Sequence, residues 1–181
     1  MHNPFLIGDK VYLRPLEKAD AVRCVPWVND PAVARTLKLF RPLNLQAEEQ
    51  FIDRTTQSEH SLVLAIVIQA TDQHIGNVGF ENFDARARST AFGIMIGEKT
   101  EWSKGYGTEA TRLMIQHGFH TLNLNRIWLH VYEYNAAALH IYQKLGFQRE
   151  GTLRQDTYRD GRYWDTIVMG LLRLEWEEQF V

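Results

Sequence analysis

Residues 103–110 read Ser103-Lys104-Gly105-Tyr106-Gly107-Thr108-Glu109-Ala110, a glycine-rich turn at the start of the longest helical pattern in the second half of the chain. Apolar residues recur at helical spacing over residues 107–121, residues 126–132 read as a strand, and residues 135–145 read as another helix. A strand pattern at residues 89–96 precedes the turn. Because a helix separates the two strands, the sequence predicts a parallel crossover connection.

The rest of the chain predicts antiparallel strands and a helical N-terminal part. Residues 62–69, 74–83 and 89–96 are rich in β-branched and aromatic residues and are separated by short polar turns, which indicates a meander. Residues 151–158 and 162–172 read as a hairpin joined at Asp160-Gly161. Further expected elements are a strand at 11–16, a helix at 20–27 ended or kinked by Pro26, a short helix after Pro31, and a helix at 46–57 capped by Asn44.

Length and composition limit the class of protein. The chain has 181 residues, which fits a single domain over residues 1–181. Its formal net charge of -2 gives no field that would attract nucleic acid. The longest apolar run, at 62–68, is shorter than the ~18–20 residues of a membrane span. Cys24 is the only cysteine, which agrees with a reducing compartment. We therefore expect a cytoplasmic protein that binds neither nucleic acid nor membrane.

The glycine-rich turn has the features of a phosphate site. Glycine lets a backbone approach a ligand closely, and the free amides at a helix start carry partial positive charge, so the turn suits a pyrophosphate. The spacing Gly105-x-Gly107-x-x-Ala110 also matches the dinucleotide fingerprint, with Glu133 where a ribose-binding acid would lie. However, residues 97–104 separate the preceding strand from the first glycine, and too little chain remains for a doubly wound sheet. A nucleotide phosphate loop matches the sequence less well still, because no Lys-Ser or Lys-Thr pair follows the glycines.

Two blocks of sequence resemble a known family. The first is Phe92-Gly93-Ile94-Met95-Ile96-Gly97 leading to the glycine-rich turn, and the second is Asn135-Ala136-Ala137-Ala138-Leu139-His140-Ile141-Tyr142-Gln143-Lys144-Leu145-Gly146-Phe147. With the chain ends at 12–16 and 161–165, they resemble the GNAT superfamily of acyl-CoA-dependent N-acetyltransferases, and more narrowly its branch containing the ribosomal-protein N-terminal acetyltransferases and spermidine acetyltransferase. The resemblance implies an α+β (mixed α/β) fold: a mixed, mostly antiparallel, splayed sheet of about seven strands flanked by helices on both faces.

The resemblance also implies where acetyl-CoA, the cosubstrate, would bind. The pantetheine arm would pair with strand backbone around Met95, Ile96 and Gly97. The pyrophosphate would be held by the amides of Trp102, Ser103, Lys104, Gly105, Tyr106, Gly107 and Thr108. Asn135 would hydrogen-bond the pantetheine chain, and Tyr142 would protonate the departing thiolate. No metal is implied, and the seven histidines form no two-ligand pattern that indicates one.

Two positions depart from the family pattern. The family often has Gln or Arg where this chain has Trp102, so only backbone could make the first phosphate contact here. Many relatives have glutamate where this chain has Ala91, serving as or supporting the general base, and alanine cannot do this. Glu81, on the neighbouring strand, is the first candidate for a base that faces the same cleft. Glu133, at the splay, is the second.

The acyl acceptor follows from amine chemistry. Only a neutral amine attacks a thioester, and a lysine-like amine has a reference pKa of about 10.4, against about 7.7–8.0 for an α-amine. Because Ala91 cannot serve as the general base, the chemistry favours an acceptor that is already largely neutral, which is a peptide or protein N-terminal α-amine. A polyamine or other small amine is the alternative, and a non-catalytic acyl-CoA-binding sensor is a further one that Ala91 keeps open. Dimers are common in the resembling family, so a homodimer is one implied assembly.

Overall fold

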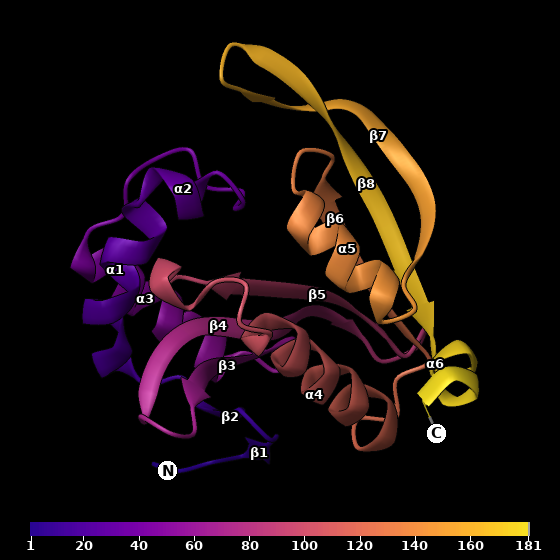
Figure 1. The fold of residues 1–181 in the computed structure, drawn as a ribbon, viewed down its shortest axis with the longest axis horizontal. Helices are drawn as coiled ribbons and strands as arrows, with labels where there is room; N and C mark the ends of the chain where they lie inside the picture. Colours follow the sequence, from indigo (N-terminus) through magenta and orange to yellow (C-terminus); the bar gives the residue numbers. More distant parts are fainter. Residues whose placement is uncertain (181) are drawn as a thin grey trace.

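The computed structural model describes residues 1–180, whose strands form one eight-stranded sheet (Figure 1). The strand order is β1-β2-β3-β4-β5-β6-β8-β7, and all neighbours are antiparallel except the parallel pair β5–β6. The strands are β1 (Leu6–Ile7), β2 (Val11–Pro15), β3 (Ser61–Ile68), β4 (Gln73–Asp84), β5 (Ser89–Ile96), β6 (Arg126–Tyr132), β7 (Gln148–Arg159) and β8 (Arg162–Leu172). The mixed sheet is as expected, with one more strand, the two-residue β1.

Helices cover both faces of the sheet, as expected. They are η1 (Lys18–Asp20), α1 (Ala21–Asn29), α2 (Pro31–Ala34), α3 (Leu45–Gln57), η2 (Lys99–Glu101), α4 (Tyr106–His120), α5 (Ala136–Lys144) and α6 (Arg173–Phe180). Because side chains alternate along a strand, β2 feeds two cores. Val11 and Leu13 pack in the core that holds Met114 of α4, while Tyr12 packs in the core that holds Ile52 of α3. No helix among residues 1–180 has the length and apolar character needed to cross a membrane.

Two helices differ from the sequence expectation. The first continues through Pro26 to Asn29, because Trp27 and Val28 are both buried and hold the last turn against the body of the protein. The terminal helix α6 was not expected at all. Its sequence has no apolar stripe at helical spacing, and Trp176 is its one buried residue.

The sheet is splayed between β5 and β6. The two strands pair only from Ser89 to Ala91 on β5 and from Arg126 to Trp128 on β6. Beyond these pairs they separate, so residues 92–96 and 129–132 do not pair with each other across the opening. The expected splay is therefore confirmed, and it leaves a strand edge open near the middle of the sheet.

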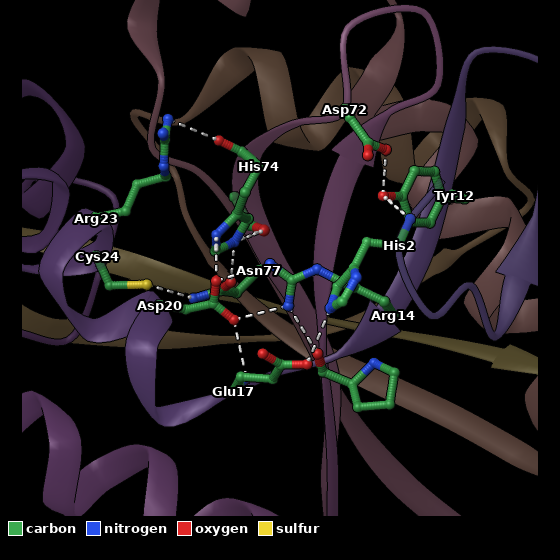
Figure 2. A network of polar contacts seen from close by, with 12 residues as sticks. His2, Tyr12, Arg14, Glu17, Asp20, Arg23, Cys24, Asp72, His74 and Asn77 are labelled. Carbon is green, nitrogen blue, oxygen red and sulfur yellow. Dashed lines mark hydrogen bonds and ion pairs between the residues drawn. The ribbon is translucent and has the colours of Figure 1, made fainter.

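A buried polar network ties β2, α1 and β4 together (Figure 2). Arg14 donates two hydrogen bonds to Asp20, at 2.8 and 2.7 Å, and His74 Nδ1 lies 3.3 Å from the same carboxylate. His74 Nε2 lies 2.9 Å from Asn77 Oδ1, and Asn77 Nδ2 donates to Cys24 Sγ at 3.4 Å. Burial alone would raise the pKa of Asp20, but the hydrogen bonds from Arg14 and His74 hold it well below its usual range.

Replacing Asp20 by asparagine is expected to lower the free energy of unfolding by about 3 kcal/mol, because it leaves the buried Arg14 guanidinium without its carboxylate partner. Since the folded-state pKa is depressed, the carboxylate stabilises the fold above the unfolded pKa of about 3.9, and this contribution is lost as the pH falls below that value. Urea unfolding from pH 7 to pH 3 measures both effects. Equal pH dependence in the variant and the parent protein would contradict this account.

Candidate functional site

The glycine-rich turn forms the N-terminus of α4. Gly105 is the N-cap residue with φ 88°, a left-handed conformation that glycine adopts without strain. The first intrahelical bond at this end runs from the Glu109 N–H to the Gly105 carbonyl at 3.1 Å. The N–H groups of Tyr106, Gly107 and Thr108 therefore lack intrahelical partners. A Cβ on Gly107 would meet Ile96 Cγ1 at 3.6 Å, an ordinary contact distance, so the turn lies against Ile96 of β5.

A lysine from the N-terminal hairpin also reaches this turn. Lys10 Nζ lies 3.4 Å from the Lys104 carbonyl, and the Lys10 N–H donates to Glu109 Oε1 at 2.9 Å. The buried Glu109 side chain thus links the start of α4 to the β1–β2 connection by a hydrogen bond. Sequence reasoning missed Lys10, because nothing local relates it to a turn so distant in the chain.

The strand residues expected to face pantetheine differ in where their backbone groups point. The Gly97 N–H donates to the Ile75 carbonyl of β4 at 2.9 Å, and a Cβ on Gly97 would lie 2.2 Å from the Trp27 ring. The Gly97 N–H is thus paired with β4, and its Cα lies against the Trp27 ring. By the alternation of antiparallel pairs, the backbone of Met95 also bonds toward β4. The Ile96 carbonyl points elsewhere, because it accepts from the Trp102 indole at 2.8 Å.

One cavity of about 560 Å³ lies at the splay, lined by residues of both β5 and β6. Its lining includes Glu81 and Met95 from the sheet and, from the other side of the opening, Asn135 and Tyr142. Glu133 has another role, because its carboxylate accepts from the Asp165 N–H at 3.0 Å in the β8 strand. The structure therefore brings together four of the residues expected in the site.

Tyr142 is held rigidly in this cavity. Its side chain is buried and packs edge-on against Phe92 and Phe147, with ring centroids 6.1 and 5.6 Å apart. Burial raises the pKa of the phenol, so the hydroxyl keeps its proton at neutral pH. Asn135 caps α5 by accepting from the Ala138 N–H at 3.2 Å. Its side-chain amide nitrogen is not used in that cap.

Two carboxylates line the cavity. Glu81 pairs in register with Ala91, directly across from the position where the family often has glutamate. Glu48 of α3 is 3% exposed, and burial raises its pKa. Sequence reasoning missed Glu48, although its helical spacing with the buried Ile52 and Thr55 indicates an inward face. No group of three or more His, Cys, Asp or Glu side chains within residues 1–180 could hold a metal ion.

A segment that we call the strap, residues 35–39, contributes to the lining of the cavity. Leu37 and Leu39 line the cavity, and Arg159 of β7 donates to both of their carbonyls, at 3.2 and 3.0 Å. Arg35 pairs with Asp160 at 2.9 Å. Figure 1 shows the β7–β8 hairpin extending from the sheet with its tip on the side of α2. The hairpin thus holds the strap across the splay.

Comparison with protein families identifies the chain. The family model described as the acetyltransferase (GNAT) domain matches residues 10–148, a range that includes the splayed strands, the glycine-rich turn and Tyr142. The chain belongs to the GNAT acetyltransferase family. It is an N-acetyltransferase, an enzyme of the acyltransferase class, and members of this family use acetyl-CoA.

Named GNAT relatives cover most of the chain. An uncharacterized N-acetyltransferase, p20, of Bacillus licheniformis is 32% identical over 94% of this chain and 97% of its own length. The spermidine N(1)-acetyltransferase of Escherichia coli K12 is 31% identical over 88% of this chain and 84% of its own length. Among solved structures, spermidine N-acetyltransferase from Vibrio cholerae in complex with CoA and spermine matches with a TM-score of 0.87 and 24% identity, over 94% of this chain and 99% of that one.

In this GNAT enzyme, replacing Arg159 by alanine is expected to free the strap. A hydrogen bond to a charged group contributes about 1.5–3 kcal/mol, which corresponds to roughly 10- to 100-fold in an opening equilibrium. We therefore expect amide hydrogen exchange across residues 35–39 to accelerate by at least about tenfold. Arg162→Ala, on the same hairpin, is the control, since Arg162 stacks on Trp164. Equal exchange rates in both variants would refute the anchoring role.

Proposed function

We propose that this enzyme transfers the acetyl group of acetyl-CoA to a primary amine of a polyamine or a similar small cationic molecule. The single observation that carries the proposal is the cavity at the splay, which places Tyr142 and two carboxylates on either side of an open strand edge beside the glycine-rich turn. A peptide N-terminus, favoured by amine pKa alone, becomes the second candidate, because named relatives act on spermidine.

The residues of the chain fit acetyl-CoA. In this proposal, the free amides of Tyr106, Gly107 and Thr108 hold the pyrophosphate, with Lys10 as an added cation nearby. The pantetheine arm pairs with the backbone at Ile96, the carbonyl that is turned away from β4, and displaces the Trp102 indole from it. Asn135 donates its unused amide nitrogen to the same arm.

The chemistry needs one proton removed and one supplied. The neutral amine nitrogen attacks the thioester carbonyl carbon, the C–N bond forms and the C–S bond breaks. Glu81, the carboxylate across from Ala91, receives the amine proton through water. The Tyr142 hydroxyl, kept protonated by burial, gives its proton to the departing thiolate. No covalent enzyme intermediate is required.

The acceptor is tested by comparing kcat/KM for spermidine with that for peptides whose N-termini are free or blocked, at constant pH. We expect spermidine to be preferred by at least about tenfold, roughly 1.4 kcal/mol in the transition state. A clear preference for free over blocked N-termini, with spermidine inactive, would return the assignment to an N-terminal α-amine. Acetyl-CoA binding without release of CoA to any amine would indicate the sensor.

The proposal also covers the cellular compartment and the oligomeric state of the enzyme. We place the enzyme in the cytoplasm, because its one cysteine, Cys24, is a buried free thiol that suits a reducing compartment. A homodimer stays a prediction that solution scattering or sedimentation can check.

A further inference from the structure

The carboxylate of Glu48 is buried without a partner. It is 3% exposed and lines the cavity, and within residues 1–180 it forms no ion pair or hydrogen bond with another group. An isolated buried carboxylate costs several kcal/mol unless a cation or hydrogen-bond donors compensate. Its place in the first turn of α3 offsets a small part of that cost, because the helix dipole favours negative charge there. A cation bound in the cavity would supply the remaining compensation and keep the carboxylate ionised.

The position of Glu48 separates it from the reacting atoms. Glu48 and Phe51, three residues apart, share one face of α3, and Phe51 packs against the same core cluster as Val63 of β3. Tyr142 faces the splay, which begins at β5. Neighbouring strands lie about 4.8 Å apart, so two steps from β3 to β5 span roughly 10 Å. Glu48 is therefore placed to hold the far end of an extended acceptor, while Glu81 lies opposite Ala91.

The rest of the cavity suits a cation carried on a hydrocarbon chain. Its walls between α3 and the splay include Val28, Leu43, Phe51 and Val63. The described titratable side chains that line it are Lys38, Glu48, Glu81, His130, Tyr132 and Tyr142. Burial, followed by the charge of Lys38, lowers the pKa of His130, so His130 is uncharged at neutral pH. Two carboxylates thus face one lysine among these groups.

We propose that Glu48 binds a second ammonium group of the acceptor, and that it thereby selects diamines and polyamines over monoamines. This inference rests on the proposed function, because it assumes that the first amine reacts at the splay. The methylene chain between the two amines lies along the apolar wall, and the distal ammonium pairs with the buried carboxylate. Glu48 is a specificity-determining residue for the acceptor and takes no part in the proton transfers.

The test compares Glu48→Gln with Glu49→Gln, a neighbour on α3 that does not line the cavity. Calorimetry with CoA present measures the Kd of spermidine, 1,4-diaminobutane and n-butylamine, and steady-state kinetics measures KM and kcat for the same amines. We expect Glu48→Gln to raise the Kd of spermidine by about 10- to 100-fold and to bring the diamine and monoamine affinities together. In Glu48→Gln, the affinity for acetyl-CoA should equal that of the parent protein. In Glu49→Gln, the Kd, KM and kcat for all three amines should equal those of the parent protein.

Each outcome decides the inference. An unchanged diamine preference in Glu48→Gln, with turnover retained, overturns the role of Glu48 and leaves the proposed function intact. A parent protein that does not bind spermidine overturns it as well. Spermidine binding that depends on Glu48 without turnover supports Glu48 as an ammonium-binding residue and rejects the transfer reaction. Thermal unfolding checks that the Glu48→Gln variant is folded, because removing an unpaired buried charge should not lower the melting temperature. Glu48→Leu provides a second variant in which an apolar side chain fills the same space.

Discussion

Replacing Gly107 by valine is expected to abolish acetyl-CoA binding while leaving the fold intact. The new side chain would lie between the turn and Ile94 and Ile96 of β5, and its branched methyl groups would hinder the close approach of the pyrophosphate to the backbone amides. The protein itself tolerates the change, because the nearest atom to the new Cβ, at 3.6 Å on Ile96, is at ordinary contact distance. Calorimetric titration with acetyl-CoA, beside a thermal unfolding curve, measures both effects.

Gly151→Val is the matched control for this substitution. Gly151 lies on β7, away from the turn, and a Cβ there meets nothing within 4 Å. We expect this variant to bind acetyl-CoA like the parent protein. If folded Gly107→Val also bound acetyl-CoA with unchanged affinity, the pyrophosphate would have to lie elsewhere.

Replacing Tyr142 by phenylalanine is expected to lower kcat by about 10²- to 10⁴-fold, the usual contribution of one general acid. Only the hydroxyl is removed, so the packing against Phe92 and Phe147 remains and the Kd of acetyl-CoA stays nearly constant. Burial keeps the phenol protonated in the resting enzyme, as an acid requires. Steady-state kinetics with CoA release as the readout gives the ratio.

Tyr158→Phe, at an exposed tyrosine on the hairpin, controls for the loss of a hydroxyl. Its kcat should match that of the parent protein. A loss below about threefold in Tyr142→Phe would assign the proton to water or to another group. A large rise in the Kd of acetyl-CoA would assign Tyr142 to binding instead.

Local sequence signals predicted the secondary structure best where they were strongest. The strands at 89–96, 126–132 and 162–172 appear with those bounds, and α3 and α5 begin directly after their cap residues, Asn44 and Asn135. The signals failed where tertiary packing decides. Burial of Trp27 carries α1 past Pro26, and α6 has no apolar periodicity of its own.

The candidate site also combines residues with a local sequence signal and residues that only tertiary contacts bring to the site. The glycine-rich turn and Tyr142 could be proposed as site residues from the sequence, because each lies within one short contiguous motif. Gly97 stays a predicted ligand contact, while contact with Trp27 and pairing with β4 already require a glycine there. Lys10 and Glu48 reach the site only through contacts between distant parts of the chain. Such contacts leave no local pattern in a single sequence.

The central claim is that acetyl transfer from acetyl-CoA to an amine takes place at the splay. The most direct test incubates the enzyme with acetyl-CoA and spermidine, measures free CoA thiol, and identifies the amine product by mass spectrometry. We expect one N-acetylated spermidine for each CoA released, with both products absent for Gly107→Val. CoA release without acetylated amine, or acetylated spermidine formed equally well by Gly107→Val, would contradict the account.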